Sequence, residues 1–145
     1  MQPTKKLRLI LVLSGLLAIA IGTAILLVPV EFHAASGIQI GTDANLLSEI
    51  RAPGGALLVL GSMMLIGVFV KPFTLASTSI AAAVYLAYGT SRLLSIALDG
   101  VPDAGLVGAT ASELVIGAAC AVALVRSTKR AGVAVPRPAH NGELA

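Results

Sequence analysis

Arg92 and Glu113 are charged residues that lie deep inside long apolar stretches of this sequence. A charged side chain at the centre of a membrane helix costs about 2.5 to 3.5 kcal/mol on insertion scales, so such residues face a protein interior and pair. A facing arginine and glutamate can neutralise each other, or they can hold a carboxylate, phosphate or quinone oxygen of a ligand. The sequence therefore indicates either a structural ion pair or a binding site.

The depths of the two charges match. Arg92 lies six residues before Leu98, about 9 Å from that end of its apolar run, and Glu113 lies seven residues after Leu106, about 10 Å from the same surface. We predict that they pair and stay ionised, with hydroxyl groups nearby as further partners. These hydroxyl groups belong to Thr90, Ser91, Thr110 or Ser112.

Other residues extend this candidate cluster. Tyr85 and Tyr88 share a helical face with Arg92 and are expected to form flat walls. Arg51 directly precedes Ala52-Pro53-Gly54-Gly55, which resembles the positive N-terminal end of a span. The predicted cluster, either a structural ion-pair network or a ligand site, consists of Arg51, Arg92, Glu113, Tyr88, Tyr85 and Glu49.

The chain lacks residues typical of catalysis or metal binding. Cys120 stands alone, and His33 has only Glu31 nearby, so no metal site is expected. No phosphate-binding loop, dinucleotide fingerprint, nucleophile elbow or zinc-protease motif is present. We therefore expect no cofactor and no enzymatic activity, and the absence of a basic face with stacking aromatics argues against nucleic acid.

Composition indicates how these residues are positioned. The chain is 57% hydrophobic and 12% charged, with a mean hydropathy of +0.94, which is typical of a protein in lipid. Each apolar run is near the roughly 20 residues that a spanning helix needs. The sequence therefore predicts an all-α membrane protein, an antiparallel four-transmembrane-helix bundle in a domain over 1–126, with spans at about 7–30, 52–70, 74–98 and 106–125.

Charge in the loops predicts the topology. Arg51 is the one basic residue beside the spans on its side, whereas eight basic residues lie on the other. Both termini are therefore expected in the cytoplasm, with residues 127–145 forming a disordered tail. The joint Lys71-Pro72-Phe73 predicts a tight hairpin, and the connection over 31–51 could lie along the bilayer or cover the bundle. Small residues that predict close helix contact are Ser14, Ala18, Gly22, Gly54, Gly61 and Gly117.

Four segments give the chain a family resemblance. They are Pro29-Val30-Glu31-Phe32 before Gly37, Arg51-Ala52 followed by Gly54-Gly55, Arg92-Leu93-Leu94 running to Asp99-Gly100, and Glu113-Leu114-Val115. Over about 7–126 the sequence resembles the bacterial four-helix membrane proteins of the domain-of-unknown-function type DUF4345, within a wider DoxX-like group. The resemblance implies a four-span bundle in the bacterial plasma membrane and implies no established activity.

Three functions remain open. The first is an accessory or scaffold subunit that packs beside another membrane protein or a second copy of itself, favoured by minimal loops and small-residue faces. The second is a binder of a quinone, lipid or other amphiphile near Arg51 and Arg92. The third and least favoured is a small transporter using Glu113, because a carboxylate at one depth leaves no relay across the other half.

Overall fold

The computed structural model describes the backbone of residues 4–133 and side chains up to Ser127. Four of its helices are long and apolar enough to cross a membrane, which confirms the predicted all-α, four-span bundle. The elements are α1 (Lys5–Leu27), α2 (Pro29–Ala34), α3 (Ala44–Phe69), the short 3₁₀ helix η1 (Lys71–Phe73), α4 (Thr74–Asp99) and α5 (Ala104–Val133).

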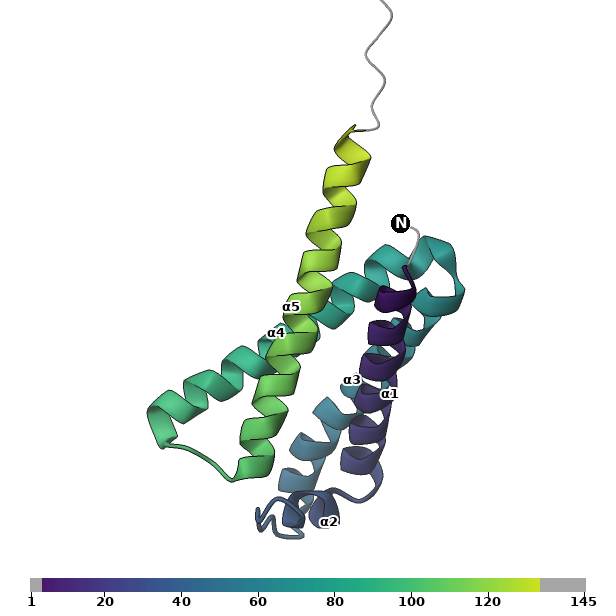
Figure 1. Ribbon diagram of the computed structural model, residues 1–145. Coiled ribbons are helices and arrows are strands. Elements are labelled where there is room, and N and C mark those ends of the chain that lie inside the picture. Colours follow the sequence, from purple (N-terminus) through teal and green to yellow (C-terminus); the bar gives the residue numbers. More distant parts are fainter. Residues whose placement is uncertain (1–3, 134–145) are drawn as a thin grey trace, which may run out of the picture.

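The long helices run antiparallel in chain order (Figure 1). The start of α1, the η1 joint and the end of α5 lie at one end of the bundle, here called the η1 end. The short helix α2 and the turn between α4 and α5 lie at the opposite end, here called the α2 end. Both ends of the described chain therefore share one end of the bundle, and their cytoplasmic location stays a prediction.

The end of the first span and the start of the second differ from the sequence-based expectation. The first span ends at Leu27 and not at Val30, because Pro29 has no N–H to continue the ladder and instead opens α2. The second span begins at Ala44 and not at Ala52, because the Asp43 side chain caps it by accepting a hydrogen bond from Leu46 N at 3.0 Å.

These boundaries change the connection over 31–51. Much of it is helical, since α2 ends at Ala34 and α3 begins at Ala44, so a long free lid is not formed. Pro53 lies inside α3 and does not open it. At the other terminus the α5 backbone continues to Val133, so the first seven residues of the expected disordered tail, 127–133, are helical instead. Residues 134–145 lie outside the described residues.

The helices associate as two pairs, and glycines bring α1 against α3. Gly22 faces Gly54, as the predicted small-residue stripes require, and Gly61 faces Gly15, which lies beside the predicted stripe residue Ser14. A Cβ atom added at Gly61 would lie 2.8 Å from the Gly15 carbonyl oxygen, and one added at Gly22 would lie 2.7 Å from the Gly54 carbonyl oxygen. The two backbones are therefore in direct contact along this pair.

The α4–α5 pair uses its glycines differently. Gly89 of α4 accepts Leu114 of α5, and Gly117 of α5 accepts Leu86 of α4. Each glycine thus provides a hollow for a leucine side chain on the other helix. The turn between the helices begins at Gly100, whose φ of 99° is a conformation that residues with a Cβ rarely adopt.

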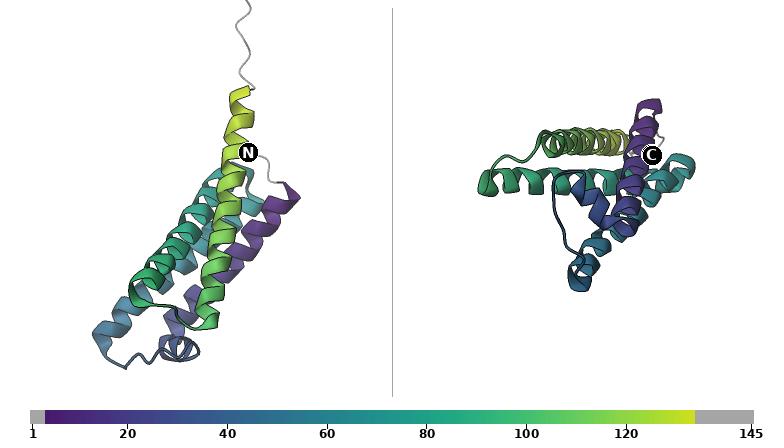
Figure 2. Two further views of the ribbon diagram at one scale, coloured as in Figure 1. Left: turned by 60° about the vertical axis from the view of Figure 1, so that its left-hand side comes forward. Right: turned by 90° about the horizontal axis from the view of Figure 1, so that it is seen from below.

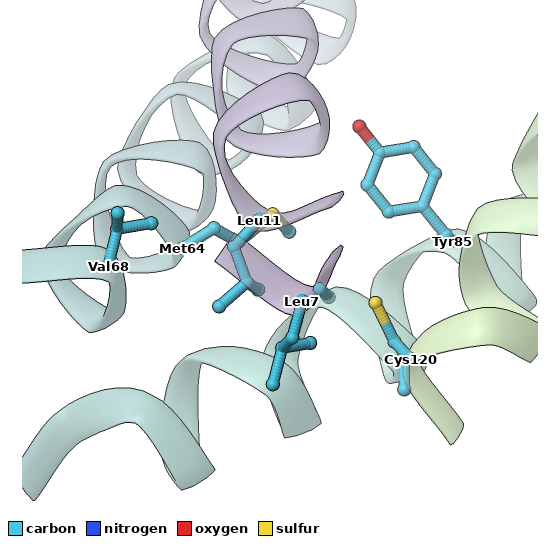
Figure 3. Packing of buried hydrophobic residues seen from close by; sticks show 8 residues of the cluster. Leu7, Leu11, Met64, Val68, Tyr85 and Cys120 are labelled. Atoms are coloured by element: carbon cyan, nitrogen blue, oxygen red, sulfur yellow. The ribbon is translucent and has the colours of Figure 1, made fainter. Parts of the chain in front are cut away.

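The two pairs meet mainly towards the η1 end. The buried apolar cluster that joins them contains Leu7, Leu11, Met64, Val68, Ala81, Ala82, Tyr85 and Cys120 (Figure 3). Hydroxyl groups strengthen this region, because Ser77 donates to the Met63 carbonyl at 2.6 Å and Thr74 donates to the Gly67 carbonyl at 2.9 Å. Towards the α2 end, α3 and α4 diverge, as Figure 1 and the view from below in Figure 2 show.

Candidate functional site

Arg92 and Glu113 form the predicted ion pair between α4 and α5. The Arg92 Nε lies 3.1 Å from Oε2 and 3.3 Å from Oε1 of the Glu113 carboxylate. The Glu113 side chain is 14% exposed and that of Arg92 is 36% exposed. No hydrogen bond from an Arg92 Nη group to another described residue is found, so these N–H groups remain available on the exposed side.

The neighbouring hydroxyl groups do not extend the pair, contrary to expectation. Thr110 donates to Leu106 O at 2.9 Å, and Thr90 donates to Leu86 O at 2.7 Å. Ser112 likewise donates within its own helix, to Ala109 O at 2.8 Å. Serine and threonine hydroxyl groups in a helix can donate a hydrogen bond to the backbone carbonyl three or four residues earlier. Here they make this local bond and not a bond to Arg92 or Glu113.

The two tyrosines have different surroundings. Tyr85 is buried, and its hydroxyl donates to the Ser14 carbonyl of α1 at 2.6 Å, so it joins the two helix pairs and does not form a wall of the site. Tyr88 is 36% exposed and lies one turn before Arg92 on α4. The predicted polar and aromatic face is thus buried at Tyr85 and opens at Tyr88.

Arg51 belongs to the α1–α3 pair. Its Nε donates to the Leu26 carbonyl at 3.1 Å. In an uninterrupted helix that carbonyl would accept from Val30, but the backbone departs from helix at Val28, so Arg51 caps an orphan carbonyl at the negative end of α1.

The expectation that Arg51, Glu49 and a helix N-terminus gather beside Arg92 and Glu113 is therefore wrong in two respects. Arg51 lies two turns inside α3, away from its N-terminus, so no helix end contributes there. Arg51 and Glu49 are both exposed, and among the described residues no hydrogen bond or ion pair joins either of them to Arg92 or Glu113. Arg92, Glu113 and Tyr88 are what remains of the predicted cluster.

A groove between α3 and α4 lies on the side of α4 that Tyr88 occupies. Its volume is about 300 Å³. It is lined by Pro53, Ala56, Leu57 and Leu60 of α3 and by Ala83, Val84, Ala87 and Tyr88 of α4. These residues were not anticipated, although the spacing of Ala83, Ala87 and Tyr88 would have indicated a small-residue face beside the aromatic ring.

A larger hollow of about 630 Å³ opens at the α2 end beside Arg51, between the end of α1 and the first turns of α3. Within the part of the chain that the structure describes, no three histidine, cysteine, aspartate or glutamate side chains gather as metal ligands. His33 makes a local contact, its Nδ1 lying 2.7 Å from the Pro29 carbonyl oxygen.

Fold and site together define a multi-pass, four-helix membrane protein with an intramembrane arginine–glutamate pair. Residues 6–124 match the family model described as a domain of unknown function (DUF4345), and the chain belongs to that family. The wider DoxX-like grouping stays a prediction. No curated protein and no solved structure matches the chain.

Proposed function

We propose that the chain is an accessory or scaffold subunit of the bacterial plasma membrane, which packs beside another membrane protein through one face of α5. The argument begins with how little of α5 its own chain covers. Within the described residues, α5 packs along α4, approaches α1 locally and has no close backbone approach to α3. In the apolar 18-residue stretch of α5 within Ala104–Ser127, 17% is buried, the lowest fraction among the four spans.

One exposed line of α5 consists mostly of small residues. We call it the α5 seam, and its members alternate at spacings of three and four. They are Gly108, Ala111, Val115, Ala118 and Val122. This spacing keeps a residue set on one side of a helix over several turns, which is the arrangement that a second helix can contact closely.

Gly108 is the observation that carries the proposal. A Cβ atom added there would meet no atom within 4 Å, so the packing of this chain does not require glycine at that position. Glycine inside a helix costs roughly 0.5 to 1 kcal/mol relative to alanine. A partner helix that approaches the α5 seam supplies a reason for glycine that the chain itself does not.

The experiment compares native mass spectra of the protein after extraction in a mild detergent. The wild type is expected in a complex heavier than its monomer, either with another membrane protein or with a second copy. Ala111→Leu/Ala118→Leu thickens the α5 seam and should release the monomer with unchanged helix content. Ala97→Leu, at an exposed position of α4, is the matched control and should leave the complex intact. A wild type that is monomeric throughout would contradict the proposal.

A further inference from the structure

The groove between α3 and α4 lies within the membrane spans and is lined mainly by apolar side chains. Its α4 side runs from Ala83 to Tyr88, about 8 Å along the helix axis. Small side chains on both walls, such as Ala56 and Ala87, keep it hollow. Over a length of about 8 Å, a volume of about 300 Å³ leaves a cross-section of roughly 40 Å², which is less than that of a helix with a diameter of about 10 to 12 Å.

A polar group adjoins one end of this groove. Tyr88 lines it, and Arg92 lies one turn further towards the α2 end. Glu113 holds the guanidinium through Nε, which fixes its plane and leaves the two Nη groups as donors. A fixed planar guanidinium is suited to binding two oxygens of a phosphate at once.

The charges beyond Arg92 are acidic. Asp99 lies seven residues further, near the same helical face and about 10 Å along the axis, where its Oδ2 accepts a hydrogen bond from Ser95 at 3.0 Å. Asp103 follows in the turn before α5. With Glu113 already beside Arg92, a ligand with a net negative charge meets repulsion here, whereas a zwitterionic headgroup offers each charge a counterpart.

We propose that this is a binding site for a zwitterionic aminophospholipid, with one acyl chain in the α3–α4 groove, the phosphate on the Arg92 Nη groups and the amine towards Asp99. The occupant comes from the bilayer itself, because the groove lies within the spans. The site is on α3 and α4 and is independent of the α5 seam, so either proposal can fail without the other.

The test is titration of the delipidated protein in detergent with phosphatidylethanolamine or phosphatidylglycerol, with bound lipid counted by native mass spectrometry. Phosphatidylethanolamine should bind with an affinity about tenfold higher than phosphatidylglycerol, and Arg92→Gln/Glu113→Gln, which removes both charges together, should lower its affinity about tenfold or more. Equal binding of the two lipids, or unchanged binding by that variant, would overturn the headgroup assignment.

The groove is tested separately. Ala83→Leu/Ala87→Leu fills it and should abolish binding, while Ala97→Leu on the same helix should leave binding unchanged. In the wild type, a phosphatidylethanolamine with a photoreactive acyl chain should label peptides of α3 and α4. Labelling confined to other helices would overturn the proposal even if a substituted protein failed to fold.

Discussion

The α1–α3 and α4–α5 pairs both rely on glycine, but they use it for different contacts. In the first pair, glycine meets glycine and the backbones touch, as at Gly22 and Gly54. In the second, glycine receives a leucine, as at Gly117 and Leu86, and an ion pair is added. A backbone contact cannot yield, whereas a side chain can change its rotamer, so the first pair should tolerate less change than the second.

The largest expected loss of stability comes from a substitution that breaks the backbone contact between α1 and α3. In Gly22→Ala the new Cβ would lie 2.6 Å from Leu58 N and 2.7 Å from Gly54 O, neither of which can move alone. We expect the free energy of unfolding to fall by about 3 kcal/mol, measured from helicity during titration with SDS in mixed micelles.

Gly55→Ala is the matched control for that change. A Cβ at Gly55 meets nothing within 4 Å, so this variant should be more stable than the wild type by about 0.5 to 1 kcal/mol. Equal stabilities for Gly22→Ala and Gly55→Ala would mean that α1 and α3 are not in backbone contact.

The corresponding change in the second pair should cost less. In Gly117→Ala the Cβ would lie 2.7 Å from Leu86 Cγ, which can withdraw, and 2.9 Å from Leu86 N, which cannot. At Gly22 both of the nearest atoms belong to the backbone, and they are closer. We expect a loss of about 1 to 2 kcal/mol in the same titration. Gly55→Ala, with open space at its Cβ, again serves as the control. A loss greater than that of Gly22→Ala would reverse the proposed ranking of the pairs.

A single hydrogen bond tests how the two pairs are joined. Tyr85→Phe removes the hydroxyl that donates to the Ser14 carbonyl, and the unfolding free energy should fall by about 1 kcal/mol. Tyr88→Phe should have little effect on unfolding, because its hydroxyl has no hydrogen-bond partner among the described residues. Similar losses in both variants would show that the Tyr85 bond does not connect α4 to α1.

The smallest effect is expected at the cap on α1. Arg51→Gln removes the cation beside the Leu26 carbonyl, at an exposed position where such helix-end interactions contribute about 0.3 to 1 kcal/mol. The midpoint of the SDS titration should therefore shift slightly. A loss clearly larger than that of Tyr85→Phe would indicate that Arg51 has contacts beyond this cap.

The sequence predicts the parts of this fold that follow from local pattern. Apolar runs locate the spans, and equal depth brings Arg92 to Glu113, since charges within a bilayer have few alternative partners. The start of α3 could not be predicted in this way. Asp43 caps the helix, and its first turns are too polar to be counted with the apolar run.

Other features depend on contacts between distant segments. Arg51 turns to α1 because the backbone departs from helix at Val28, 23 positions earlier. The groove beside Tyr88 exists because α3 and α4 meet near η1 and then diverge. The spacing of residues around Arg51 does not predict the break in α1, and the spacing around Tyr88 does not predict the angle between α3 and α4.

The most direct test of the Arg92–Glu113 contact is a double-mutant cycle. Arg92→Ala and Glu113→Ala should each lower the free energy of unfolding, and the double variant should lose less than the sum of the two, with a coupling of about 0.5 to 3 kcal/mol. The same cycle between Arg51 and Glu113 should give no coupling, since Arg51 bonds to α1. Additive losses for Arg92 and Glu113 would contradict the ion pair on which the description of the site depends.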